Sequence, residues 1–282
     1  MGCVARCSVV ADELSRRLVP DELWELVEPL LPEFRQREQG GGTAPVDQRA
    51  VFKAVVYVLT SGCAWRMLPP SFGVSVPTAH RRFSVWTEVG VWRRLHRAVL
   101  DELGSEGLID WSRAVIDAAS VRAKKGALTG PSPVDRGKPG SKIHVLSDRN
   151  GIPLSVAVSA ANVHDSQALK PLVKAIPAVQ SRRGPQRRRP AKLHADKAYD
   201  QPELRLWDRR RGMAVRIARK GIESAERLGR HRWVIERTIS WLTGYRRLNI
   251  RYERKGSHFL AFLIMAAALT CFKKLKKAKP AT

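Results

Sequence analysis

The stretch KIHVLSDRNGIPLSVAVSA, residues 142–160, decides the fold of this chain. It holds two runs rich in valine, isoleucine and leucine, one on each side of Asn150-Gly151. This dipeptide strongly favours the tight turn of a β-hairpin. Pro153 stands at the beginning of the second run, a position where a strand tolerates a proline. The stretch therefore predicts two antiparallel strands joined by a short turn.

Segments on both sides extend this hairpin into a larger sheet. RAVIDAASVRA, residues 113–123, is short, apolar and compatible with a strand, so it predicts an antiparallel meander of three strands. Downstream, helical and strand patterns alternate in segments 164–176, 191–196, 201–212, 213–218 and 230–242. The resulting order β-β-β-α-β-α-β-α needs helical crossovers, which implies parallel pairing of the later strands. We expect an α/β fold with a mixed sheet and flanking helices, in which the first and fourth strands can be neighbours.

The part of the chain before residue 110 shows helical patterns only. Apolar residues follow helical spacing in 20–32, with helix-start chemistry at Asp21, and residues 47–62 have a capping Asp47 and a terminal Gly62. Residues 75–104 predict two helices with a break near Gly90. We therefore expect a small all-α domain, residues 1–109, followed by an α/β domain, residues 110–282.

The charge of the chain indicates a polyanionic partner. Its 282 residues include 51 lysines and arginines against 26 aspartates and glutamates, a formal net charge of +25. Such a charge favours nucleic acid as partner first and an anionic membrane surface second. Because 44% of the residues are hydrophobic, the chain can bury real cores and is not a disordered basic tail.

Cysteine usage and apolar runs favour a cytoplasmic protein. The four cysteines are too few and too scattered for a disulfide scaffold, and none has zinc-site spacing. The most apolar run, residues 259–272, is shorter than the roughly 20 residues that span a bilayer, so it predicts a buried core helix and no membrane association. No secretion signal is recognisable at the N-terminus.

Three acidic residues are candidates for chemistry. Asp117 interrupts an apolar strand, where it is either a strand-end residue bonded to nearby backbone or a metal ligand. Asp196 ends a strand, at the place where ligands bind in sheets with parallel strands. Asp200, before Gln201-Pro202, is the better candidate to cap the following helix, which leaves Asp196 for another role.

Glu236 gains a possible role only when it is considered with the other two acids. Alone, it predicts an i, i+4 ion pair with Arg232, which contributes about 0.2–0.5 kcal/mol. Ile235, Ile239 and Leu242 form an apolar face beside it. If this last helix packs across the first and fourth strands, Glu236 meets Asp117 and Asp196. Three such oxygen ligands suit Mg²⁺ or Mn²⁺, and two such ions can promote an in-line phosphoryl transfer.

Four segments of the α/β part resemble insertion-sequence transposases of the DDE type, in the insertion-sequence-five group. They are VIDAASVRAKKG, GKPGSKIHVLSDRNGIPLSVAVSAANVHDS, LHADKAYD and HRWVIERTISWLTGYRRLNIRYER. In the helical part, LWELVEPLLP, SGCAWRMLP and TAHRRFSVW also resemble this family. The resemblance covers about residues 15 to 275, with the segments in the family's order and spacing.

The resemblance implies a ribonuclease-H-like fold with Asp117, Asp196 and Glu236 as catalytic and metal-binding acids. It implies that a metal-activated water, with two Mg²⁺ or Mn²⁺ ions, cuts one strand at the end of the element. The freed 3′-hydroxyl then attacks a target phosphodiester. The expected partners are the terminal inverted repeats, the target DNA and a second copy of the chain, on the nucleoid in the cytoplasm.

The family's signature around the glutamate is Tyr, two residues, Arg, three residues, Glu, six residues, Lys. Arg232 and Glu236 fit it, while Gly229 takes the tyrosine position and Thr243 the lysine position. Arg246 and Arg247 lie one turn further on, and we expect one or the other to replace the lysine. With Arg232, they are our expected DNA contacts near the acids.

A second DNA-binding candidate lies in the helical part, in PTAHRRFSVWTEVGVWRRLHR. It is basic, carries Trp86 and Trp92, and follows a turn, as in a helix-turn-helix arrangement. The expected contacts are Thr78, Arg81 and Arg82. The alternative is a solvated basic face on a core helix. The basic segments RRGPQRRR and KKLKKAK are expected to hold phosphates without reading bases.

Smaller expectations concern residues near the acids. Asp165 or Ser166 is expected to cap the helix that follows His164, and His194 is expected to pack beside the site. Two rival functions remain beside a transposase: a catalytically inactive DNA-binding regulator derived from one, and a ribonuclease-H-like hydrolase without strand transfer. The presence of all three acids favours the enzyme over the regulator.

Overall fold

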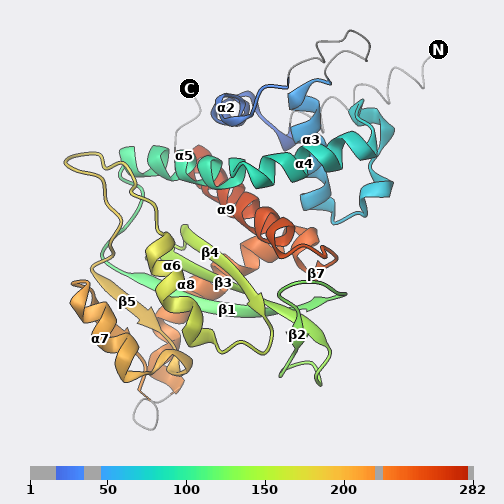
Figure 1. Ribbon diagram of the computed structural model, residues 1–282. Helices are drawn as coiled ribbons and strands as arrows, with labels where there is room; N and C mark the ends of the chain where they lie inside the picture. Colours follow the sequence, from blue (N-terminus) through green and yellow to red (C-terminus); the bar gives the residue numbers. More distant parts are fainter. Residues whose placement is uncertain (1–16, 35–45, 220–224, 279–282) are drawn as a thin grey trace. The chain divides into compact units, whose positions relative to one another are not determined.

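The structure, a computed structural model, describes residues 17–34, 46–219 and 225–278 (Figure 1). The chain divides into two compact units, Met1–Leu95 and His96–Thr282. Helix α5 (Val91–Ser105) runs through the division, so its first turn belongs to the first unit and the rest to the second.

The first unit is helical, as the sequence predicts. Its elements are α2 (Asp21–Val27), η1 (Glu28–Leu30), α3 (Gln48–Ser61), η2 (Trp65–Met67), η3 (Pro70–Phe72) and α4 (Val76–Glu88). The Asp47 carboxylate accepts the N–H groups of Arg49 and Ala50, and Gly62 ends α3 with a φ of 73°. Gly90, with a φ of 76°, separates α4 from α5. The predicted start and end of α3 and the predicted break at Gly90 are therefore confirmed.

An aromatic cluster forms the core of the first unit. Phe52, Phe83, Trp86 and Trp92 are almost completely buried, and the rings of Phe83 and Trp92 lie 5.7 Å apart. Trp86 and Trp92 contact each other edge to face at 6.0 Å. These tryptophans therefore stabilise the helical core and are not available to DNA, contrary to the role that the basic segment around them suggested.

The second unit contains a mixed sheet of the predicted kind. Its strands are β1 (Ala114–Ala123), β2 (Gly130–Pro131), β3 (Pro139–Asp148), β4 (Pro153–Ala160), β5 (Lys192–Ala195), β6 (Ala214–Ile217) and β7 (Ile250–Arg251). β1, β3 and β4 form the antiparallel meander, while β5 pairs in parallel with both β1 and β6. The first and fourth predicted strands are thus neighbours, and the order β4-β3-β1-β5-β6 is ribonuclease-H-like. Strands β2 and β7 were not predicted, because two residues leave no alternating pattern.

The hairpin between β3 and β4 turns at the predicted dipeptide. Gly151 has a φ of 85°, a conformation that glycine adopts without strain. Asp148 is completely buried, and its carboxylate accepts the N–H groups of Asn150, Ile152 and Asp110, each at 2.8 Å. This carboxylate therefore replaces the ladder bonds that the turn lacks.

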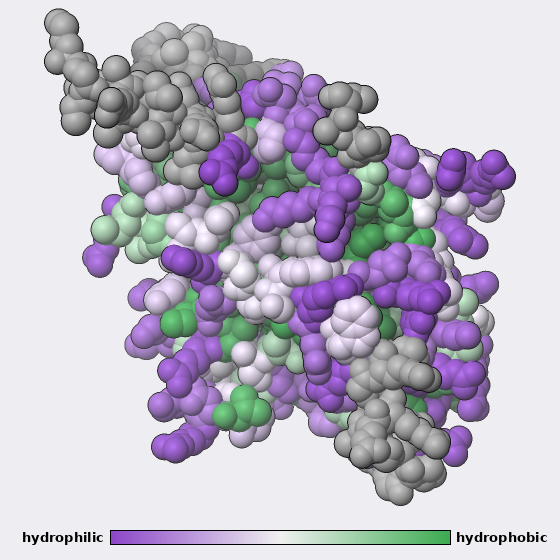
Figure 2. Space-filling model, turned by 180° about the vertical axis from the view of Figure 1, so that it is seen from behind, coloured by the Kyte–Doolittle hydropathy of each residue, from purple (hydrophilic) through white to green (hydrophobic). Residues whose placement is uncertain are grey.

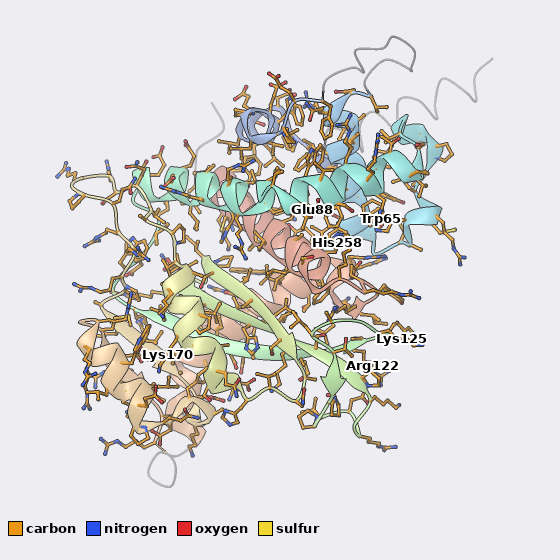
Figure 3. All side chains as sticks on the ribbon, in the orientation of Figure 1. Trp65, Glu88, Arg122, Lys125, Lys170 and His258 are labelled. Carbon is orange, nitrogen blue, oxygen red and sulfur yellow. The ribbon has the colours of Figure 1, made fainter. Side chains whose placement is uncertain are left out.

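Helices cover both faces of the sheet (Figure 1). They are η4 (Asp165–Ala168), α6 (Leu169–Ala175), η5 (Lys197–Tyr199), α7 (Pro202–Arg210), α8 (Ala225–Thr243), η6 (Arg246–Leu248) and α9 (Gly256–Ala278). Helix α6 packs on β3 and β4, whereas α8 packs on β1 and β3. Lys170 of α6, labelled in Figure 3, forms an ion pair with Glu203 that links α6 to α7.

Helix α9 contains the most apolar run of the chain. Among the described helices, it alone has the length and composition of a candidate membrane span, and 83% of its most apolar window is buried inside the structure. It packs along β4 and against α8. The predicted core helix is therefore confirmed. Hydrophilic side chains cover most of the face shown in Figure 2.

A buried arginine lies at the end of the sheet that is opposite the β3–β4 turn. Arg251 in β7 has no exposed surface, and its guanidinium donates to the carbonyl oxygens of Ala127 and Leu128 and to the Ser141 hydroxyl. Because these groups lie in the loop after β1 and in β3, one side chain connects three segments that are distant in sequence.

Candidate active site

Asp117 lies in the middle of β1, with its carboxylate partly buried. One oxygen accepts the N–H of Ala118 at 2.8 Å, and the other lies 3.5 Å from Nε of Arg232. Burial raises the pKa of Asp117 to about 6, against the lowering effect of that backbone bond and of Arg232. The negative charges of Asp196 and Asp165 raise this pKa further, so both carboxylates lie within electrostatic reach.

Asp196 directly follows β5, the parallel neighbour of β1. Its carboxylate caps η5 by accepting the N–H of Ala198 at 2.9 Å. The prediction that Asp200 takes the capping role is wrong, because Asp200 binds Nε of Arg205 at 2.7 Å. The chain forms a separate turn of 3-10 helix directly after β5, so the first N–H groups in need of a cap follow Asp196.

Both aspartates line one cavity of about 520 Å³. Its walls come from the adjacent strands β1, β5 and β6 and from helices α7 and α8. Five arginines line it as well: Arg205, Arg209, Arg216, Arg219 and Arg232. His194, expected to pack beside the site, also lines this cavity. The cavity therefore combines a pair of carboxylates with a strongly basic surround, which suits a polyanionic substrate that is handled by acidic groups.

Glu236 does not lie in this cavity with the aspartates. Its side chain is 58% exposed, and Nε of Arg232 lies 3.1 Å from its carboxylate. The same nitrogen lies 3.5 Å from Asp117, so Arg232 stands between the two acids. Among the residues that the structure describes, no group of three or more histidine, cysteine, aspartate or glutamate side chains is arranged to hold a metal ion. The structure thus brings Asp117 and Asp196 together and connects Glu236 to them through an arginine.

Helix α8 is fixed to the sheet by the predicted apolar face and by two hydrogen bonds. Ile235 and Leu242 are completely buried, and Ile239 is half-buried. The Thr238 hydroxyl donates to the carbonyl oxygen of Gly151 at 2.8 Å, and Arg237 donates to that of Asn150 at 2.9 Å. The hairpin that decides the fold therefore also positions the helix that carries Arg232 and Glu236.

The predicted DNA contacts divide into exposed and buried residues. Arg81 and Arg246 are exposed, whereas Thr78 is half-buried, and its backbone N–H and its hydroxyl both bond the capping Ser75. Arg82 is only 5% exposed, with its guanidinium over the ring of Phe34. Its burial argues against a contact with DNA.

Arg247 is buried too. Its Nε donates to the buried carboxylate of Glu253 at 2.7 Å. A guanidinium held in this way supports the turn after η6 and cannot reach a phosphate. Of the two arginines expected to replace the family's lysine, the structure leaves Arg246 exposed.

Two further residues near the aspartates differ from expectation. The cap of η4 is His164, whose Nδ1 accepts from Ser166, and not Asp165 or Ser166. Asp165 instead forms an ion pair with Lys142 at 2.9 Å. The cap was misassigned because a carboxylate is the commoner cap, but here the lysine of β3 attracts it away from the helix start.

Tyr199 in η5 was not predicted to belong to the site. It is 1% exposed, and its hydroxyl has no hydrogen-bond partner among the residues that the structure describes. Burial raises its pKa, and the charges of Asp165, Asp117 and Asp196 add to the effect. The phenol therefore lies beside the carboxylates. Its position three residues after Asp196 was the signal available in the sequence.

Comparison with known proteins agrees with this geometry. Residues 110–271 match the family described as "Transposase DDE domain", and residues 19–96 match "Putative transposase of IS4/5 family". The chain is 43% identical over 150 residues to "Putative transposase for insertion sequence element IS402" of Burkholderia cepacia, across 53% of this chain and 71% of that protein. It is 42% identical over 112 residues to "Insertion element IS402 uncharacterized 16.2 kDa protein" of the same organism, across 39% and 76%.

The solved structures that match this chain are distant from it in sequence. A piggyBac transposase synaptic complex with hairpin DNA has a TM-score of 0.44 at 10% identity, covering 96% of this chain and 77% of that one. A pre-cleavage Mos1 transpososome has a TM-score of 0.31 at 11% identity, covering 86% and 82%. The family matches span most of both units, and the first covers more than half of the chain. This protein therefore belongs to the DDE transposase family, and it is a transposase.

Proposed function

We propose that this transposase cuts and joins DNA at the ends of its insertion element, with Asp117, Asp196 and Glu236 as its acids. The observation that carries the proposal is the meeting of Asp117 and Asp196 on adjacent parallel strands in a cavity lined by five arginines. Phosphodiester chemistry of this kind needs carboxylates near the reacting phosphorus and positive charges along the DNA backbone. This cavity offers both.

The residues around Asp117 fit a divalent cation. Its carboxylate lies beside a second carboxylate, and burial raises its pKa to about 6, with the charge of Asp196 adding to the effect. Carboxylate oxygens are the ligands that Mg²⁺ and Mn²⁺ prefer. Glu236 joins the aspartates only if Arg232 releases it. Two such ions, when bound, would activate the attacking oxygen and stabilise the leaving one.

The chain's own residues have distinct roles in this proposal. Asp117 and Asp196 mark the end of the site where the reaction takes place. Each carboxylate is held in position by a hydrogen bond from a backbone N–H. Arg232 gives up its carboxylate partners and binds the scissile phosphate, whose two non-bridging oxygens match two N–H groups of the planar guanidinium. Arg246, exposed after α8, contacts the flanking backbone.

The two parts of the chain divide the work. We propose that the helical part, residues 1–109, recognises the terminal inverted repeats through the exposed face of α4 that carries Arg81. The α/β part, residues 110–282, cuts the strand and transfers the 3′-hydroxyl to target DNA. Two copies of the chain hold two ends, on the nucleoid in the cytoplasm.

One experiment tests the proposal. The protein is incubated with a duplex that carries the element's terminal repeat, with Mg²⁺ or Mn²⁺, and the products are analysed for new 3′-hydroxyl ends. We expect nicking at the repeat by the wild type and none by Glu236→Gln. End binding without nicking by the wild type would instead favour the inactive DNA-binding regulator.

A further inference from the structure

The cavity of Asp117 and Asp196 has a basic wall at the edge of the sheet. Arg209 from α7, Arg216 from β6 and Arg219 just after β6 line this wall. All three side chains are exposed, and none forms a hydrogen bond or ion pair with a residue that the structure describes. The wall therefore presents three guanidinium groups with their donors available.

The other two arginines of the cavity are engaged within the protein. Arg205 donates to the Asp200 carboxylate at 2.7 Å and to the carbonyl oxygen of Ile217 at 2.8 Å. Arg232 lies between Asp117 and Glu236. Arg205 thus fixes α7 to the end of β6, and this contact sets the position of Arg209, which lies one turn later on the same face.

Three like charges at one cavity wall repel one another, and no ion pair with a described residue offsets this repulsion. Guanidinium groups bind phosphate oxygens in pairs, with planar geometry and strong charge-assisted hydrogen bonds. A DNA backbone bound in the cavity would place its phosphates at this wall and offset the repulsion. The ligand class that the wall fits is therefore a phosphodiester.

We propose that Arg209, Arg216 and Arg219 form a phosphate clamp for the strand that the enzyme cuts. The proposal rests on the proposed function, since Asp117 and Asp196 define where the scissile linkage lies. β6 is two strand spacings from β1, roughly 10 Å, because neighbouring strands lie about 4.8 Å apart. Phosphates of one strand rise about 3.4 Å per nucleotide, so the clamp binds a linkage within about three nucleotides of the cut.

The clamp gives the site a direction. One end of the cavity holds the acids, and the other end holds the clamp, so the bound strand lies across β1, β5 and β6 in a fixed orientation. In this orientation a single phosphodiester lies at the acids. Binding of a distant phosphate by the clamp thus helps to position the phosphodiester that reacts.

Charge-neutral linkages test the clamp. A series of end duplexes carries one methylphosphonate each, at successive linkages near the cut site, and affinity is measured by fluorescence anisotropy in EDTA. We expect wild-type affinity to fall roughly tenfold at one or two of these linkages. The full-length triple variant Arg209→Ala, Arg216→Ala, Arg219→Ala should bind the unmodified duplex more weakly and lose no further affinity at those linkages.

A matched variant controls for the loss of charge. Lys125→Ala, Arg136→Ala, Lys138→Ala removes three exposed cations that lie outside the cavity, and it should keep the full methylphosphonate effect. Equal methylphosphonate effects in the clamp variant and the wild type at every linkage would overturn the clamp. The affinity measurements need neither metal nor cleavage. A wild type that never nicks DNA would therefore refute the proposed function, whereas the clamp is still tested by comparing the methylphosphonate effect in the wild type and in the clamp variant.

Discussion

At the scale of single residues, Asp208 is a carboxylate that the fold buries at a cost. Its side chain has no exposed surface, and neither oxygen has a hydrogen-bond partner among the residues that the structure describes. Burial raises its pKa to about 7, and only the charge of Arg211 opposes this. A buried, unpaired carboxylate is unfavourable in its ionised form, so the protein folds more readily when Asp208 is protonated.

Asp208→Asn should therefore change how stability depends on pH. Because the folded-state pKa lies above the ordinary value of 3.8, the wild type loses stability as pH rises from about 4 to 7, by at most about 1.4 kcal/mol per pH unit. The variant lacks this loss. The free energy of unfolding is measured in urea at several pH values. The variant should become more stable relative to the wild type as pH rises to about 7, and the difference should stay constant above that pH.

Because the two proteins are compared at the same pH, the contributions of other groups that titrate in this range cancel. His96 and His144 are buried with pKa values lowered to about 4, and the pKa of Asp148 is raised to about 6. These groups are common to both proteins. A stability difference between wild type and variant that does not vary with pH would show that folding does not shift the pKa of Asp208.

The carboxylate of Asp117 offers a second test at this scale. Asp117→Asn keeps the size and the bond from Ala118 but removes the charge, so end binding should persist while Mg²⁺-dependent nicking disappears. Anisotropy and a nicking assay on the same preparation measure the two effects. Normal nicking by this variant would exclude Asp117 as a metal ligand.

Sequence patterns point to candidate residues by type, but they do not report burial. Arg82 and Arg247 occupy basic segments typical of DNA contacts, yet each is 5% exposed. Arg247 is buried because Glu253 lies opposite it, a partner that only the turn after η6 brings close. The clamp arginines were invisible for the same reason, since their common wall depends on how β6 joins the sheet.

At the scale of elements, the order of strands and helices was predictable because each segment carries its own periodicity and stop signals. The Asn150-Gly151 turn, the Asp47 cap and the Gly62 end all act locally. Helix caps near the site were not predictable, because Lys142 of β3 binds Asp165 and leaves His164 to cap η4, and because a separate turn, η5, takes Asp196 as its cap. The ion pair of Glu236 with Arg232, which the i, i+4 spacing predicts for Glu236 taken alone, is present in the structure.

The contact of α8 with the β3–β4 turn can be tested by substitution. A Cβ on Gly151 would lie 2.6 Å from the Thr238 hydroxyl, and the residue has a φ of 85°. Gly151→Ala should therefore destabilise the fold by more than the roughly 1–2 kcal/mol of left-handed strain alone. Thermal unfolding measures the effect, and nicking should fall with it because α8 carries Arg232.

Gly184→Ala is the matched control. Its φ is 88°, but nothing lies within 4 Å of the added Cβ, so only the strain remains. In a Thr238→Ala background, Gly151→Ala should cost less stability than in the wild type, because the colliding hydroxyl is gone. Equal destabilisation by Gly151→Ala and Gly184→Ala would show that α8 does not press on the turn.

At the scale of the whole molecule, the net charge of +25 predicts how binding responds to salt. Each phosphate contact releases counterions, so the logarithm of affinity should fall linearly with the logarithm of salt, with a slope of about −0.9 per contact. Titrations of random and end-bearing duplexes between low and moderate salt measure this slope. A flat dependence would refute binding dominated by phosphates.

Helix α5 determines where the chain can be divided. From His96 onward it belongs to the second unit, where Nε2 of the buried His96 bonds the carbonyl oxygen of Pro153 and the Asp101 carboxylate accepts the N–H of Gln180. A fragment that begins at residue 110 loses these contacts, whereas one that begins at residue 91 keeps them. We expect the longer fragment to melt cooperatively and at a higher temperature, by circular dichroism, and to lack end specificity.

A similar melting temperature for both fragments would show that α5 contributes nothing to the second unit. If the fragment from residue 91 still distinguished end DNA from random DNA, recognition would not reside in the helical part of the chain.

The tryptophans give each unit its own optical signature. Trp86 and Trp92, in edge-to-face contact within the first core, should produce exciton-coupled near-ultraviolet dichroism that disappears when that core opens. Trp233, on α8 beside Arg232, is 52% exposed with the guanidinium of Arg237 over its ring, so soluble quenchers should reach its fluorescence. Unfolding of the helical core and arrival of DNA at the acids can thus be followed as two separate signals in one unlabelled sample.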